Sequence, residues 1–261
     1  MRGLLIFALL FTTTCLSTGI KAIAQDEPGY KLPPKDIIDL VMTKPTPGVS
    51  IDNKGEWLLM LERSSFPTVE ELAQPELRIA GLRINPNNFG PSRSNYSTGF
   101  ELKNTKTGKV FPVKGLPEKL QAGFVQWNPS ENKIAFTNTT NTDITIWIID
   151  VASQEAKQLS KEPVNAVIGA PFMWVNDDQI LYKSVVEGID KQPAKPLAPT
   201  GPVIQESKGK MAASRTYQDL IKSPYDEALF GFYATTQLKK VSTSAGQPTA
   251  LGKPSIYGTW N

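Results

Sequence analysis

The fold of this chain is decided by residues 124–159, which read FVQWNPSENKIAFTNTTNTDITIWIIDVASQEAKQL. This stretch holds four short apolar runs separated by turn signals, at Phe124–Trp127, Lys133–Thr137, Ile144–Ile149 and Ala156–Leu159. Four strands with tight turns in roughly 40 residues are typical of one antiparallel propeller blade. The unbroken apolar character of the third run predicts a strand that is covered on both faces. One blade cannot bury that surface alone, so the pattern predicts repeats.

Two landmarks of the stretch recur along the chain. The turn after the third strand is found at Asn104–Lys109, Asp150–Lys157 and Ser242–Gln247. The tryptophan of the first strand, Trp127, recurs as Trp174 and Trp260. The first interval is 47 positions, which suits a blade of ~40–50 residues. The second interval is 86 positions, so that blade carries about 40 extra residues.

An earlier opening hairpin is predicted from Val49–Gly55 followed by Trp57–Leu61. Together the repeats predict an all-β fold, namely an incomplete β-propeller of about three to four antiparallel four-stranded blades over residues 46–261. Residues 64–95 depart from the blade pattern, with a helical turn expected at Glu70–Ala73. A Pro-rich, partly helical insertion is predicted at about 187–227, with helical spacing at Thr216–Ile221 and Pro224–Leu229. Loops of this length are typical of lids, binding loops or disorder.

Residues 1–24 are predicted to be a secretory signal peptide. Arg2 supplies the positive start, Leu4–Phe11 the apolar region, and Ala22-Ile23-Ala24 a small-residue cleavage site. The apolar region is too short for a permanent membrane anchor. The only cysteine, Cys15, lies in this segment, and the residues before it match a lipoprotein signal poorly. We therefore expect export to a periplasm or beyond, and a mature chain without disulfides.

Composition argues against several classes of partner. Without residues 1–24 the chain has 26 basic and 25 acidic residues, which gives no electrostatic case for nucleic acid or an anionic membrane surface. Residues 25–45 are polar and proline-bearing, with a short helical or extended piece at Pro34–Met42. We expect this segment to be a strap along the side of the propeller.

The sequence contains no histidine, so a Ser-His-Asp or Cys-His arrangement is impossible within these residues. The Gly-x-Ser-x-Gly elbow, paired cysteines, histidine zinc motifs, the phosphate loop and the dinucleotide fingerprint are also missing. We accordingly predict no catalytic, cofactor-binding or metal-binding residue in this chain.

Several weaker patterns each have a structural interpretation beside a functional one. The acidic pair Asp177-Asp178 falls where a turn between strands is expected. Glu70-Glu71 suits the start of a helix, and Lys239-Lys240 suits a solvated strand edge. Four tryptophans could suggest a platform on which sugars or bases stack: Trp127, Trp147, Trp174 and Trp260. They occupy repeat positions, which indicates that they pack the blades instead.

Three arginines in the irregular region, Arg78, Arg83 and Arg93, could face a ligand carboxylate or pair with acidic residues of the chain. Asn95-Tyr96-Ser97 and Asn138-Thr139-Thr140 are glycosylation acceptors only in a eukaryotic secretory pathway.

Three longer motifs carry a family resemblance: Pro33–Ile37, Leu77–Pro86, and Ala213–Leu220 with Pro224–Glu227. They resemble the exported serine peptidases of the prolyl-oligopeptidase family, in particular the glutamyl-endopeptidase-like branch. The resemblance covers essentially the whole mature chain. It implies an N-terminal β-propeller that caps an α/β-hydrolase domain and restricts entry to peptides.

This chain departs from the family because no hydrolase domain follows residue 261, so a truncated product or fragment is expected and no catalytic residue can be carried over. The resemblance implies a gating propeller of a peptidase acting on peptides, without catalysis of its own. Two alternatives remain open: a stand-alone periplasmic propeller that binds or scaffolds, and an enzyme using carboxylates only, for which the spacing gives no support.

Overall fold

A computed structural model describes residues 31–188, 191–198, 201, 206, 209, 217–244 and 246–259. The chain divides into two compact units, Met1–Thr43 and Lys44–Asn261. In the first unit the described residues form one helix, α2 (Lys35–Val41), so the helical alternative for this segment is the correct one. The expected signal peptide, Cys15, Trp260 and Ala213–Thr216 lie outside the described residues, and the strap contact stays a prediction.

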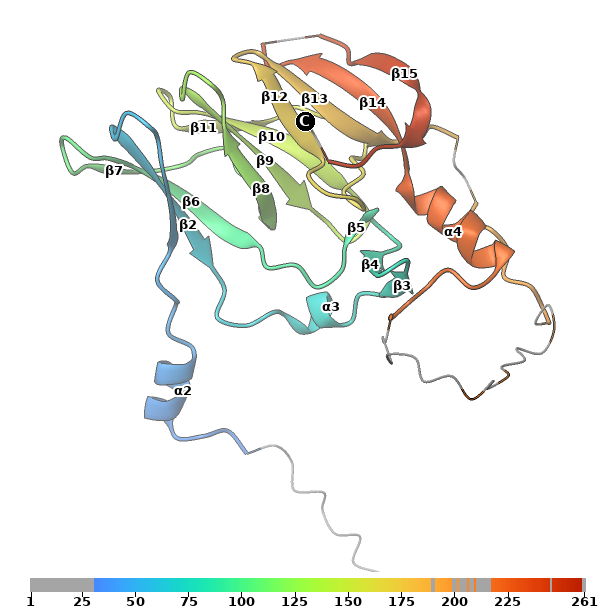
Figure 1. The fold of residues 1–261 in the computed structure, drawn as a ribbon. Coiled ribbons are helices and arrows are strands. Elements are labelled where there is room, and N and C mark those ends of the chain that lie inside the picture. Colours follow the sequence, from blue (N-terminus) through green and yellow to red (C-terminus); the bar gives the residue numbers. More distant parts are fainter. Residues whose placement is uncertain are drawn as a thin grey trace, which may run out of the picture. The chain divides into compact units, whose positions relative to one another are not determined.

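The second unit is built from three antiparallel meanders of four strands each (Figure 1). The first blade is β1 (Gly48–Ile51), β2 (Trp57–Arg63), β6 (Ser97–Asn104) and β7 (Val110–Pro112). The second is β8 (Ala122–Trp127), β9 (Lys133–Thr139), β10 (Ile144–Asp150) and β11 (Glu155–Gln158). The third is β12 (Phe172–Asn176), β13 (Gln179–Val185), β14 (Thr235–Ser242) and β15 (Thr249–Ile256).

These blades confirm the predicted all-β fold of antiparallel four-stranded units. Backbone pairing joins the first and second blades at two places: Ser97 pairs with Ala122, which links β6 to β8, and Lys114, just after β7, bridges to Glu155 of β11. The described residues form no closed ring, as the prediction of an incomplete propeller requires.

The second blade packs its two faces against different neighbours. Ile134, Phe136 and Ile149 meet Leu59 and Phe100 of the first blade, and the rings of Phe100 and Phe136 lie edge to face at 5.0 Å. On the opposite face a second cluster joins β9 and β10 to the third blade, through Ala135, Ile144, Ile146, Ile148, Phe172, Ile180, Tyr182 and Val241. Coverage of both faces therefore accounts for the unbroken apolar run of β10.

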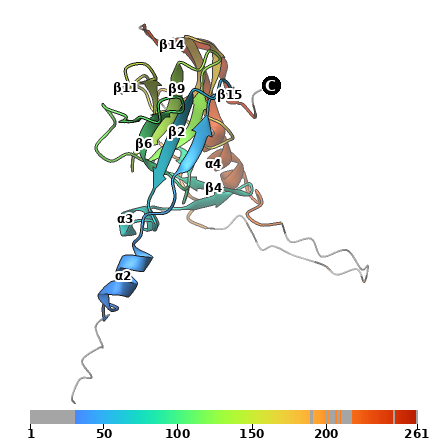
Figure 2. The same ribbon diagram turned by 90° about the vertical axis from the view of Figure 1, so that its left-hand side faces the viewer.

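Both irregular segments interrupt their blade at the same place, between its second and third strands. The first insertion, residues 64–96, holds helix α3 (Val69–Leu72) and a small sheet of β3 (Leu77–Ile79), β4 (Leu82–Asn85) and β5 (Gly90–Pro91). The second insertion, residues 186–234, ends in helix α4 (Pro224–Ala234). Figures 1 and 2 show α3, β4 and α4 beyond the same end of the three blades.

The two insertions share a hydrophobic core of their own. Ile79 and Ile84 of the small sheet contact Leu229 and Tyr233 of α4. The ring of Phe89 lies 5.2 Å from that of Tyr233, and Gly81 donates a backbone hydrogen bond to the carbonyl of Asp219 at 3.3 Å. Segments more than 100 residues apart in the sequence thus form one packed unit at this end.

Helix α4 extends further than the sequence pattern predicted. Its start is well marked, since Ser223 accepts a hydrogen bond from the amide of Asp226 and Pro224 occupies the first turn. Burial of Leu229 and Tyr233 stabilises the helix as far as Ala234. The second insertion therefore ends at residue 234 and not at the expected 227. The helical spacing expected at Thr216–Ile221 was wrong for Tyr217–Ile221, which form no helix because the cap lies beyond them.

The interleaved packing of the first and second blades predicts a large cost for Phe136→Ala. The side chain is fully buried, so its removal should lower the free energy of unfolding by about 3–5 kcal/mol. Urea denaturation of the two proteins measures this difference. Val110→Ala, at a position that is 45% exposed, is the control and should change stability by less than about 0.5 kcal/mol. A loss below about 1 kcal/mol for Phe136→Ala would contradict this packing.

Candidate functional site

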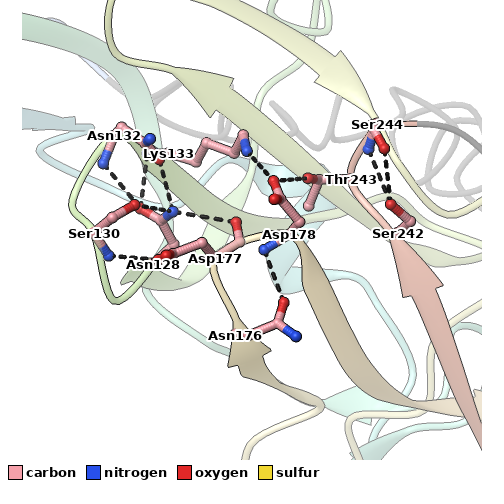
Figure 3. Close-up of polar contacts among 10 residues, drawn as sticks. All are labelled: Asn128, Ser130, Asn132, Lys133, Asn176, Asp177, Asp178, Ser242, Thr243 and Ser244. Carbon is pink, nitrogen blue, oxygen red and sulfur yellow. Dashed lines mark hydrogen bonds and ion pairs between the residues drawn. The ribbon is translucent and has the colours of Figure 1, made fainter.

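The hairpins that open the blades are tied together by polar side chains at one end of the sheets (Figure 3). Asn128, which is buried, accepts hydrogen bonds from the amides of Asn132 and Lys133 and donates one to the carbonyl of Asp177 at 3.2 Å. On its other side Glu131 accepts from the backbone amide of Asn53 at 2.7 Å. The second blade's turn therefore links the corresponding turns of the first and third blades.

The acidic pair Asp177-Asp178 lies in the turn between β12 and β13, as predicted. Asp177 accepts a hydrogen bond from the amide of Ser130 at 2.7 Å. Asp178 forms an ion pair with Lys133 at 2.5 Å, and the hydrogen bond from that ammonium group lowers the pKa of Asp178. Both carboxylates thus join neighbouring blades, and neither is directed into a cavity with a second acid.

The tryptophans confirm their predicted packing role where the structure describes them. Trp127 donates its indole hydrogen to Ser50 of the first blade at 2.8 Å, and Trp174 donates to the carbonyl of Gln126 at 3.3 Å. Each first-strand tryptophan therefore reaches back to the first strand of the preceding blade. Trp147 stacks on Phe136, with ring centroids 6.4 Å apart.

Glu70-Glu71 begins helix α3, which confirms the structural interpretation. Glu71 forms a capping box with Thr68, accepting from the Thr68 amide at 2.6 Å while its own amide donates to the threonine hydroxyl. Glu71 also accepts from Gln121 of the second blade at 2.8 Å. Glu70 accepts from Asn141, in the turn between β9 and β10, at 2.5 Å. These carboxylates hold the first insertion against the second blade.

The expectation that Lys239-Lys240 is a solvated edge was wrong. Strand β14 lies between β13 and β15, so neither residue is on an edge. Lys239 is 7% exposed and donates to Glu162 at 2.6 Å and to Glu187 at 2.8 Å. Burial disfavours its charge, but these two hydrogen bonds raise the pKa of Lys239 above its ordinary value. The ion pairs fasten the start of the second insertion to the third blade.

The three arginines of the first insertion converge on one carboxylate. Glu76, whose side chain is 8% exposed, pairs with Arg78 at 2.8 Å, with Arg83 at 3.4 Å and with Arg93 at 3.4 Å. Arg78 and Arg83 are cross-strand partners in β3 and β4, where like charges repel. Glu76 relieves this repulsion, and hydrogen bonds from Ser92 and Arg78 lower the pKa of Glu76 to about 2. Structural pairing is thus confirmed.

Beside Arg93 lies a cavity of about 380 Å³, which we call the Arg93 cavity. It lies between the end of the first insertion, Arg93–Tyr96, and strands β8 and β9 of the second blade, with Phe124, Thr137 and Thr139 among its walls. A smaller cavity of about 110 Å³ shares Arg93–Tyr96 and is lined further by Glu71 and several carboxamides. Tyr96 lines both cavities, and burial raises the pKa of its phenol.

The backbone of Phe124 is unusual at this cavity. Its φ is 50°, in the left-handed region that costs energy for a residue with a Cβ. The register of β8 against β9 shifts between Gly123 and Gln126, so the strand bulges at this point. At this bulge Phe124 is 38% exposed and forms part of the wall of the Arg93 cavity.

The two glycosylation sequences differ in accessibility. Asn138 is buried, and its side-chain oxygen accepts from the amide of Gln121 at 2.9 Å. Asn95 is exposed and lines both cavities. Only Asn95 could therefore be reached by a modifying enzyme in the folded chain.

The described part of the chain contains no group of three or more acidic, cysteine or histidine side chains placed to hold a metal ion. No helix within these same residues has the length and hydropathy needed to cross a bilayer.

Sequence reasoning missed three buried polar residues of this unit. Glu76 belongs to no recognised motif. Its position two residues before Arg78 could have indicated an ion pair with that arginine. Asn128 falls in the turn expected between Phe124–Trp127 and Lys133–Thr137, but nothing in the sequence marks it as the link between three hairpins. Lys183 is 1% exposed and donates to the carbonyls of Ile168 and Gly258, each at 2.7 Å, and burial lowers its pKa. An isolated lysine within a strand pattern gives no sequence signal for such a role.

The lowered pKa of Glu76 predicts a pH-dependent stability difference between the wild type and Glu76→Gln. A carboxyl whose pKa is about 2 when folded and about 4.5 when unfolded stabilises the fold above pH 4.5, and this contribution disappears as the pH falls towards 2. The difference in urea midpoint should therefore be largest at neutral pH and shrink below pH 4.5. Glu118→Gln, at an exposed loop position, is the control and should show no such trend. A pH-independent difference for Glu76→Gln would contradict the pairing.

Comparison with known proteins finds two long matches. The chain is 35% identical over 243 residues to a probable chloroplastic glutamyl endopeptidase of Oryza sativa subsp. japonica, covering 88% of this chain and 26% of that protein. It is 31% identical over 259 residues to a probable chloroplastic glutamyl endopeptidase of Arabidopsis thaliana, covering 93% of this chain and 27% of that protein. The chain thus spans about a quarter of the length of the curated relatives it matches. No family model matches it.

Among solved structures, the acylaminoacyl peptidase of Pyrococcus horikoshii is similar with a TM-score of 0.40 and 12% identity, over 85% of this chain and 27% of that one. Likeness at that level carries no argument about chemistry. The comparison therefore rests on the sequence identities to the two plant proteins. This chain is thus similar, over nearly all of its own length, to proteins named as probable glutamyl endopeptidases, which confirms the resemblance to that branch.

Proposed function

We propose that this chain forms the substrate-admitting, propeller part of an exported serine peptidase that hydrolyses peptides. The observation that carries the proposal is the 35% identity to a protein named as a glutamyl endopeptidase, across 88% of this chain. In this proposal the acyl-enzyme chemistry, with its activated serine and oxyanion hole, belongs to residues outside these 261. The missing histidine supports this division, because a serine triad cannot be assembled here.

The arrangement of the insertions supports a gating role. Both insertions emerge beyond one end of the blades and share a core that includes Ile84 and Leu229. Their bases are fixed to the blades, the first through Glu71 to Gln121 and the second through Lys239 to Glu187. Long connections held on a rigid scaffold are where binding residues concentrate. We assign peptide selection to this end of the molecule.

A stand-alone binding module is the second candidate function. It is favoured by the two hydrophobic clusters that close between the three blades within this chain. The size of the native product separates the candidates, detected with an antibody against residues 25–261 in an extract of the source organism. A band far heavier than 28.6 kDa supports the peptidase, and one at or slightly below this mass supports the module.

The proposed division of labour predicts the activities of two products. The 261-residue chain should hydrolyse a fluorogenic glutamyl peptide no faster than buffer, while the longer product of the same gene should hydrolyse it. If the second insertion restricts entry as proposed, removal of residues 191–217 from the longer product should preserve cleavage of short peptides and raise cleavage of longer ones. Release of fluorescence measures the first outcome, and cleavage of peptides of graded length the second. Hydrolysis by the chain alone, at a rate above buffer, would refute the proposal.

The proposed export predicts the mature N-terminus. Cleavage after Ala24 should leave Gln25 as the first residue of the protein recovered from the periplasm or medium. Mass spectrometry of the N-terminal peptide measures this. Ala22→Leu together with Ala24→Leu should block cleavage and retain the precursor, whereas the conservative change of Ile23 to Val should not. Recovery of an intact Met1 in an exported wild-type protein would contradict the prediction.

A further inference from the structure

Among the described residues, the first and third blades each have a neighbouring blade on only one face. The second blade lies between them and covers one face of each (Figure 1). Side chains alternate between the two faces of a strand, and directly opposite residues of an antiparallel pair share a face. The pairing register therefore identifies the residues on the two remaining faces.

The first blade turns an apolar surface away from the second blade. In β2 Leu59 is buried toward the second blade, so Leu58 and Met60 point to the other side. Their partners in β1 are Ile51 and Val49, which are 57% and 59% exposed. Contiguous apolar surface that water reaches is typical of an interaction site. We call this surface the first-blade outer face; its residues are Val49, Ile51, Leu58, Met60, Glu101 and Lys103.

The third blade has a corresponding surface on its own far side. In β13 Tyr182 is buried toward the second blade, so Leu181 and Lys183 point to the other side. Lys183 already donates to two backbone carbonyls, and the apolar neighbour Leu251 is 37% exposed. We call this surface the third-blade outer face; its residues are Met173, Leu181, Lys183, Leu238, Lys240 and Leu251.

The repeat shows how the first-blade outer face is covered when a neighbour is present. Asp52, in the turn after β1, accepts hydrogen bonds from the amides four and five residues later, as Asn128 does after β8. These equivalent turns align Met60 with Phe136. Phe136 is fully buried between the second blade and the first. The first-blade outer face therefore repeats the surface that the second blade presents to the first.

The same comparison applies to the third-blade outer face. Trp174 pairs with the residue before Leu181, as Trp127 pairs with the residue before Ala135. Leu181 is thus equivalent to Ala135, which is buried toward the third blade. The third-blade outer face repeats the surface that the second blade presents to the third. The two outer faces are therefore the two halves of one blade interface.

Charges on the two outer faces are complementary at one position. Glu101 lies opposite Met60, and Lys240 lies opposite Leu181. Neither forms an ion pair with a residue that the structure describes. The residues that occupy their positions in the interface of the first and second blades, Trp147 for Glu101 and Leu102 for Lys240, meet in one hydrophobic cluster. Packing of the outer faces in the same way brings Lys240 of one molecule to Glu101 of another.

We infer that this chain associates with a second copy of itself, with the third-blade outer face of one copy on the first-blade outer face of the other. Each copy offers both halves of the interface, so two copies form two identical contacts and close on themselves. Two copies of three blades give six, within the roughly four to eight blades of closed propellers. The inference rests on the blades alone and not on the proposed function.

Sedimentation velocity of the 261-residue chain tests the association directly. We expect a species of twice 28.6 kDa that dissociates on dilution. A wild-type chain that remains monomeric at about 100 µM would overturn the inference, because a specific interface of this kind should hold at that concentration.

Met60→Asp and Leu181→Asp each place a charge on one outer face. Either change should weaken association at least about thirtyfold, as expected for the centre of an interface. Val69→Asp, in α3 at a position that is 83% exposed and outside both faces, is the control and should change it by less than about threefold. Residues 1–24 are present in every variant and cannot account for a difference. Thermal unfolding verifies that each variant is folded.

Mixing the two variants tests the head-to-tail arrangement. The Met60→Asp chain keeps an intact third-blade outer face, and the Leu181→Asp chain keeps an intact first-blade outer face. The equimolar mixture should therefore form a dimer that neither variant forms alone. If one variant alone dimerises as the wild type does, a single face pairs with itself, and the inference is overturned. Failure of the mixture to dimerise would also overturn it.

Glu101→Gln and Lys103→Gln form a matched pair on one strand of the first-blade outer face. Glu101→Gln should weaken association about threefold, because it removes the partner of Lys240. Lys103→Gln should leave association unchanged or strengthen it, because Lys103 repels that same cation. A loss in Lys103→Gln without a loss in Glu101→Gln would show that the faces meet in another orientation, against the inference.

The outcomes also separate this inference from the proposed function. If the chain dimerises through both outer faces but the longer gene product has no peptidase activity, the association stands and the proposed function falls. If the longer product cleaves peptides while the 261-residue chain stays monomeric, the function stands and the association falls.

Discussion

The structure depends on covering both faces of the second blade. Strands β9 and β10 alternate so that Phe136 and Ile149 point one way and Ala135 and Ile148 the other, and all four are buried. Neither face can be left to water without losing about 1.5–3 kcal/mol for each large side chain. The first and third blades are therefore required partners, not appendages. Polar turns, with Asn128 and Asp177 at their centre, then fix how the blades are aligned along their edges.

The meander connectivity explains why the irregular segments gather at one end. In an antiparallel sheet the connection from the second to the third strand always emerges on the opposite side from the connection between the first and second. The two insertions and the short turn at 140–143 occupy this position in their blades, so they meet beyond the same end. Contacts such as Asn88 to the carbonyl of Thr140 follow from that placement. The insertions can thus vary in length at one end of the blades, while the polar turns at the other end hold the blades together.

Blade strands and turns were predictable because their signals are local. Ile134 and Phe136 alternate within one strand, and Trp127 and Trp174 repeat at blade spacing. The role of Lys239 was not predictable, since its burial depends on Glu162 and Glu187, which are distant in the sequence. Glu76 and the Arg93 cavity escaped for the same reason: their partners come together only when the first insertion folds onto the second blade. Sequence patterns thus predicted the strands and turns of the blades. They could not predict the contacts of Glu76 and Lys239, which depend on residues distant in the sequence.

A nearly balanced net charge is compatible with a local cluster of positive charge, such as the three arginines around Glu76. The balance of 26 basic and 25 acidic residues beyond residue 24 governs long-range attraction, which is screened within about 8 Å at physiological salt. The arginines around Glu76 act at shorter range than this, since their ion pairs measure 2.8 Å for Arg78 and 3.4 Å for Arg83 and Arg93. Such a cluster adds little to the rate of encounter with a distant charged partner. The effect of the cluster is therefore local: its ion pairs hold β3, β4 and the end of the first insertion together.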